Sequence, residues 1–185
     1  TDNLKAAGAF QDEKVIREFL DIEEQFDWAH YCLQAWKLAG EGDKILIGGE
    51  PNVVDHLIYI IAACLPNEQR RDVTFTTYDP IESPPSVRIH GVYLEPDDDD
   101  MPEGYYRDGQ FTLNTRMPGH HAKLPNDEHA ASCREILARL RDYGAEGVAS
   151  ILQFSATVGR GGGRDIELAF RLFPEAGQSI TLDAA

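Results

Sequence analysis

Apolar residues recur at alternating intervals of four and three between residues 12 and 39. They are Val15, Phe19, Ile22, Phe26, Ala29, Leu33 and Trp36. This spacing places them on one stripe, so the pattern predicts a single long helix over residues 12–39. Gly40 and Gly42 follow at its expected end. The stripe fits two interpretations, a helix packed on its own domain or a coiled-coil contact with a partner.

A second pattern covers residues 44–78 and predicts a strand, a glycine turn, a buried helix and another strand. The first strand ends before Gly48-Gly49, and Pro51 suits the first turn of the helix that follows. Apolar residues fall on nearly every face of this helix, which indicates deep burial. The second strand is rich in threonine and aromatic residues. Two strands joined by a helix predict a βαβ unit with parallel strands.

Weaker patterns complete the fold prediction. Further strands are expected at 87–94, 111–115, 166–173 and 179–182, and further helices at 126–144 and 145–157. Asn126 is the expected N-cap of the first of these helices, and Gly144 its end. We therefore predict an α/β domain over residues 1–158, with a parallel or mixed sheet and flanking helices around the central βαβ unit. Residues 159–185 are expected to form a glycine-rich joint and C-terminal strands packed on the same domain.

The charge and the cysteine content limit the classes of partner and the cellular location that we expect. The net charge is −15, from 32 acidic against 17 basic residues, which argues against binding of nucleic acid or of anionic membranes. No apolar run approaches the roughly 20 residues of a membrane helix. Cys32, Cys64 and Cys133 are widely spaced in predicted helices, which indicates buried free thiols and a cytoplasmic location.

The central stretch resembles a known family. A strand ending in Gly48-Gly49 leads to an apolar helix that closes with Leu65-Pro66, then to Arg70-Arg71 and the strand Phe75-Thr76-Thr77-Tyr78. This order is similar to the middle domain of the bacterial GTPase-associated protein family, over roughly residues 25–95. The resemblance implies one domain of a large multidomain protein, associated with bacterial conflict and defence systems that contain GTPases. It implies no catalytic role for any residue.

Three motifs are candidates for ligand sites, and each favours a structural interpretation. The Gly48-Gly49 turn lacks a following lysine, and Glu50 and Asp55 would repel phosphate. The His120-His121 pair has no zinc-type spacing. The acidic run over 97–100 lacks the alternation of a calcium loop. We predict no catalytic residue, cofactor or metal.

The leading functional hypothesis is therefore a non-enzymatic scaffold or protein-interaction domain that binds a protein or other domains of a longer chain. The residues proposed to contact a partner are Phe19, Phe26, Trp36, Arg70 and Arg71. Self-association through the first helix is a further hypothesis. The alternative is a hydrolase or nucleotide-binding domain that uses the Gly48-Gly49 turn or the His120-His121 loop, so enzymatic activity stays open.

Overall fold

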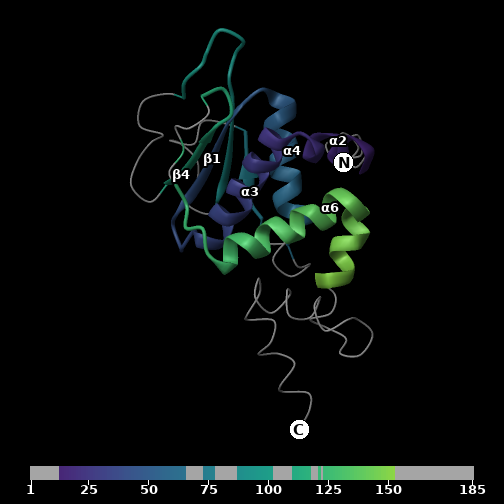
Figure 1. Ribbon diagram of the computed structural model, residues 1–185. Helices are drawn as coiled ribbons and strands as arrows, with labels where there is room; N and C mark the ends of the chain where they lie inside the picture. Colours follow the sequence, from purple (N-terminus) through teal and green to yellow (C-terminus); the bar gives the residue numbers. More distant parts are fainter. Residues whose placement is uncertain are drawn as a thin grey trace, which may run out of the picture.

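The computed structural model describes residues 13–65, 73–77, 87–101, 110–117, 121 and 123–152. In these ranges lie four helices and four strands (Figure 1). The helices are α2 (Glu13–Asp21), α3 (Glu23–Leu38), α4 (Pro51–Ala63) and α6 (Glu128–Leu152). The strands are β1 (Lys44–Gly49), β2 (Phe75–Thr76), β3 (Ile89–Tyr93) and β4 (Gln110–Asn114).

The four strands form one parallel sheet in the order β2-β3-β1-β4, which confirms the α/β prediction. β1 lies in the interior, with Ile45 opposite Ile89 on one side and opposite Phe111 on the other. Helix α4 carries the chain from β1 past β3 to β2. The predicted βαβ unit therefore exists, with a third strand inserted between its two strands.

The main core lies between one face of the sheet and the helices. Alternate residues of a strand point to opposite faces, and Ile45, Ile47, Ile89 and Leu113 belong to the same buried cluster as the helical residues. On the other face, Leu46 packs with Leu94 and Met101 in a separate small cluster. Helix α4 is buried along most of its length, as predicted. The three cysteines are buried free thiols, also as predicted.

The prediction of one helix over residues 12–39 was wrong. Ile22 has an extended backbone (φ −84°, ψ 118°) and serves as the N-cap of α3, so the chain changes direction between α2 and α3. Its side chain is 50% exposed, although it continues the apolar spacing, whereas Ile16 and Leu20 are buried. The reason is tertiary: α2 packs along α6, and Arg17 Nε donates to the carbonyl of Arg141 at 3.1 Å.

Helix α6 bends where the sequence indicated. Gly144 has φ 69° and separates two helical segments, and a Cβ there would lie 2.7 Å from a Glu13 carboxylate oxygen. The N-cap prediction was wrong by one residue. Asp127 Oδ1, not Asn126, accepts hydrogen bonds from the backbone N–H groups of His129 and Ala130, each at 3.0 Å. The expected joint and strands after residue 158 lie outside the described residues.

Candidate interaction surface

Gly48 and Gly49 form the end of strand β1, and both are explained by close packing. A Cβ on Gly48 would lie 2.5 Å from Cε of Met101, and a Cβ on Gly49 would meet Oγ1 of Thr115. Thr115 Oγ1 also donates to the Gly48 carbonyl at 3.0 Å. The two glycines therefore allow neighbouring segments to approach β1 closely.

The carboxyl ends of the strands, where α/β proteins commonly bind ligands, are crossed by the chain itself. Arg116 Nη1 donates to the carbonyl of Pro96 at 2.9 Å, and Asn114 Nδ2 donates to that of Asp99 at 3.0 Å. Arg116 Nη2 also lies 3.6 Å from the carboxylate of Glu50, at the start of α4. The two hydrogen bonds hold the acidic loop across the carboxyl ends of the strands. The positive charge of Arg116 lies next to the Glu50 carboxylate.

A further contact on this edge joins Tyr93 and Asp55. The Tyr93 hydroxyl donates to Asp55 Oδ1 at 2.8 Å. Partial burial raises the pKa of Tyr93, and the adjacent Asp55 carboxylate raises it further. The phenol is therefore held in its neutral, donating form. Glu50 and Asp55, the two acids singled out in the sequence, therefore both lie near the carboxyl ends of the strands.

The histidine pair is described only at His121, because His120 lies outside the described residues. The imidazole of His121 packs against the ring of Tyr31, with ring centres 4.9 Å apart. Within the described part of the chain, no group of three or more His, Cys, Asp or Glu side chains could hold a metal ion. The same part holds no helix with an apolar stretch that could cross a bilayer.

The predicted partner-contact residues occupy different environments. Phe19 and Trp36 are 6% and 5% exposed and belong to the main core, and the Arg88 guanidinium stands 4.1 Å from the Trp36 ring centre. Phe26 is half-buried at the surface, packed against that core. Arg70 and Arg71 lie outside the described residues. Of the three that are described, Phe26 is the one whose side chain is partly exposed.

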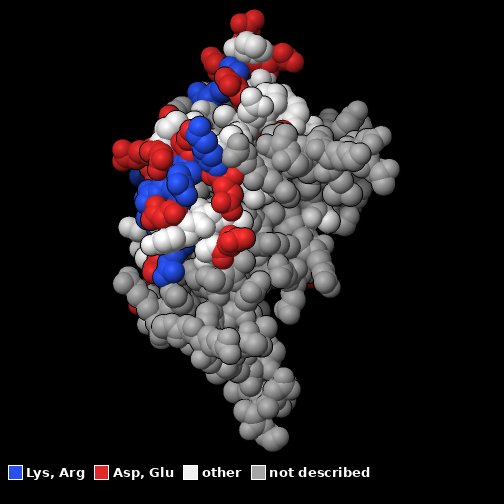
Figure 2. Space-filling model, turned by 90° about the vertical axis from the view of Figure 1, so that its right-hand side faces the viewer, with Lys and Arg blue, Asp and Glu red and all other residues white. Residues whose placement is uncertain are grey.

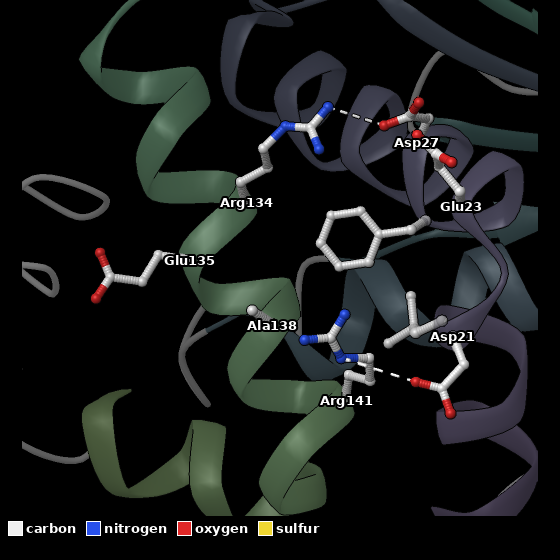
Figure 3. A pocket seen from close by; sticks show the side chains of 9 residues that line it. Asp21, Glu23, Asp27, Arg134, Glu135, Ala138 and Arg141 are labelled. Carbon is white, nitrogen blue, oxygen red and sulfur yellow. Dashed lines mark hydrogen bonds and ion pairs between the residues drawn. The ribbon is translucent and has the colours of Figure 1, made fainter.

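Phe26 lines a groove of about 480 Å³ between the α2–α3 junction and α6, here called the first groove. In Figure 3, Arg134 and Arg141 extend from α6 toward α2 and α3, and Glu135 points away from the groove. The Arg134 guanidinium lies 2.8 Å from the Asp27 carboxylate, and the Arg141 guanidinium lies 3.9 Å from that of Asp21. Both arginines also lie near the Phe26 ring, at 5.7 and 5.8 Å from its centre.

A second groove, of about 520 Å³, lies on the other flank of the first turns of α3. Its lining residues are Ile22, Glu23, Glu24, Asp27, Trp28 and His121. Glu23 and Asp27 line both grooves, so these two residues form a ridge between them, here called the acidic ridge. The exposed Ile22 and the half-buried Trp28 are the apolar residues of this second groove. The surface therefore combines apolar walls with carboxylates on one short helical segment.

In the coloured part of Figure 2, basic and acidic side chains are interleaved. On the candidate surface, by contrast, the side chains contributed by the start of α3 are acidic or apolar. Sequence reasoning missed the surface because the regular apolar spacing continues through Ile22. The available signal was Glu23-Glu24, since acidic residues favour the first turn of a helix.

Comparison with known proteins identifies the family of this chain. The sequence model of the family described as GTPase-associated protein 1, middle domain, matches residues 16–111. No curated protein and no solved structure matches the chain. The matched range runs from within α2 through α3, β1, α4, β2 and β3, and ends at the second residue of β4. This chain belongs to the GTPase-associated protein 1 middle-domain family.

Proposed function

We propose that this chain is a non-enzymatic interaction domain of a multidomain bacterial protein in a GTPase-linked conflict or defence system. Family membership supports the link to GTPases. The observation that carries an interaction role is the candidate surface around the start of α3, where two grooves flank the acidic ridge. Apolar groove walls beside charged rims are typical of protein-binding sites.

The partner in this proposal is a protein or another domain of a longer chain. The net charge of −15 disfavours nucleic acid, because phosphate binding requires clustered positive charge. A cytoplasmic setting agrees with three free, buried thiols. Self-association through the first helical region is a second form of the same proposal, and Phe26 is the described residue of that region best placed for it.

The direct test is co-purification of the longer gene product with GTPases encoded near its gene. Wild-type protein is expected to form a complex that Ile22→Ser with Phe26→Ser weakens. Tyr143→Ser is the matched control, because Tyr143 is an exposed aromatic residue on α6 that lines neither groove. Circular dichroism checks that each variant is folded. Equal binding by all variants would assign the interaction to another surface, and absence of any complex would count against the function.

Nucleotide binding is the competing outcome and needs its own measurement. The 185-residue chain is heated with and without ATP or GTP and Mg²⁺, and hydrolysis is followed in parallel. The proposal expects no change in Tm and no turnover. A rise in Tm that Gly49→Ala or His120→Ala abolishes, in variants that remain folded, would overturn it in favour of a nucleotide-binding or hydrolytic domain.

A further inference from the structure

We propose that the partner of the candidate surface is a basic amphipathic segment, with apolar side chains entering the two grooves and a Lys or Arg side chain meeting the acidic ridge. This inference rests on the proposed function and deepens it by naming the chemistry of the partner. It follows from the placement of charges and apolar groups on the first turns of α3.

The charge balance of the surface is the first step. Four carboxylates line the two grooves from the α2–α3 side, those of Asp21, Glu23, Glu24 and Asp27. Arg134 pairs with Asp27 at 2.8 Å, whereas Arg141 pairs with Asp142 at 2.9 Å and lies 3.9 Å from Asp21. Glu23 and Glu24 have no ion-pair partner among the described residues. Within the described part of the chain these two carboxylates have no compensating cation, and a cationic group is the complementary ligand.

The apolar walls are the second step. The first groove is lined by Phe26, Leu20 and Ala138, and the second by Ile22 and Trp28. Apolar side chains on the two sides of a cation would contact both walls at once. Residues three or four positions apart on a partner helix lie on the same face, about one turn apart. An amphipathic helix with leucines at such spacing and interspersed lysines has the required pattern.

A second copy of this chain is a poorer occupant. Each copy carries a net charge of −15, so two copies repel each other at long range. Within the candidate surface the arginines are already beside Asp21 and Asp27. A basic segment of a different protein or of another domain fits the uncompensated carboxylates better.

The test uses the 185-residue chain and three fluorescently labelled synthetic helical peptides. One contains leucine and lysine in a 3.5-residue repeat, one replaces every lysine by glutamate, and one keeps the composition of the first in scrambled order. The leucine–lysine peptide is expected to bind most tightly, and its affinity to fall with added salt. Equal binding of the glutamate peptide, or of the scrambled one, would overturn the proposal.

Variants locate the binding site. Glu23→Gln with Glu24→Gln is expected to weaken binding, and Glu23→Lys with Glu24→Lys to weaken it by about tenfold or more. The control, Glu41→Lys with Asp97→Lys, makes the same change in net charge at two exposed acids outside both grooves. An equal loss of peptide affinity in the control variant would show a general effect of net charge, and it would overturn the assigned binding site. Circular dichroism confirms that α3 keeps its helix, since Glu23 and Glu24 lie in its first turn.

Failure of this inference can be separated from failure of the proposed function. If the longer gene product binds its protein partner equally with and without Glu23→Lys and Glu24→Lys, the interaction role stands and the basic-segment inference is wrong. If neither the wild-type nor the substituted gene product recovers that partner, while the leucine–lysine peptide binds at the acidic ridge, the GTPase-linked function is wrong. The inference that the surface binds a basic segment then stands.

Discussion

The Arg134 guanidinium on α6 lies 2.8 Å from the Asp27 carboxylate on α3 and so spans the first groove. Both side chains are about half exposed, at 55% and 53%. An exposed ion pair of this kind contributes about 0–1 kcal/mol to stability. Its larger effect is on charge, because Arg134 compensates one of the two carboxylates of the acidic ridge.

Arg134→Ala is therefore expected to strengthen binding of the leucine–lysine peptide by a few-fold while lowering stability by no more than about 1 kcal/mol. The change leaves the Asp27 carboxylate available to a cation of the partner. Fluorescence titration and urea denaturation measure the two effects. Lys14→Ala removes the same charge from α2, where Lys14 pairs with Glu18, and serves as control. Weaker binding after Arg134→Ala would instead show that the arginine itself contacts the partner.

Phe19 and Phe26 are expected to respond differently to truncation, although they occupy equivalent positions in the sequence pattern. Phe19 is buried in the core, so Phe19→Ala should cost about 3–4 kcal/mol of unfolding free energy. Phe26 is half-buried, so Phe26→Ala should cost roughly 1 kcal/mol and act mainly on partner binding. Urea denaturation gives both values, and light scattering reports any change in oligomeric state. Similar costs at the two positions would contradict the surface role of Phe26.

The contact of Gly48 with Met101 predicts a compensating pair of substitutions. Gly48→Ala forces a Cβ to within 2.5 Å of Met101 Cε and should cost about 1–3 kcal/mol. Adding Met101→Ala removes the clash, so the double variant should be more stable than the sum of the two single effects by about 1 kcal/mol or more. Gly40→Ala is the control, because its Cβ would make an ordinary 3.4 Å contact. Strict additivity would mean that the glycine is not required by this contact.

His90 predicts a pH dependence of stability. Its side chain is buried, its Nε2 lies 3.0 Å from the Val87 carbonyl, and among the residues that the structure describes its Nδ1 has no hydrogen-bond partner. Burial lowers the pKa of His90, and the bond to Val87 offsets only part of that effect. The unfolded chain takes up a proton as the pH falls through about 6.5, whereas the folded chain does so only at lower pH. Stability should therefore decrease as the pH is lowered from 7 to 5.

Urea denaturation at several pH values tests this expectation. Burial also lowers the pKa of His30 and His56, so replacing His90 should remove part of the slope. His90→Asn is expected to be less stable at every pH but to depend less on pH than wild type. His129→Asn is the matched control at a histidine outside the sheet. An unchanged slope in His90→Asn would exclude His90 as a source of the pH dependence.

The α/β class and most of the elements were predictable because their signals are local. A proline in the first turn and a nearly continuous apolar surface indicate helix α4. Gly144 marks the bend in α6 because a positive φ favours glycine. The family resemblance rested on residues 44–78, and the family match includes that stretch.

The candidate surface could not be predicted, because it depends on contacts between distant residues. Asp27 and Arg134 are 107 positions apart, and nothing in the sequence indicates that they meet. The break at Ile22 was equally hidden, because the apolar spacing is the same on both sides of it. Phe19 is buried in the core against His56 of α4, whereas Phe26 is half-buried beside two arginines of α6.

Local patterns, then, determined that this chain contains a βαβ unit, a buried α4 and amphipathic helices, since residue spacing and backbone preference act over a few positions. Tertiary structure alone decided the strand order β2-β3-β1-β4, the filling of the space beside Gly48 by Met101, and the two grooves beside the acidic ridge. The physical reason is that burial and charge pairing depend on which distant segments pack together, and spacing along the chain carries no such information.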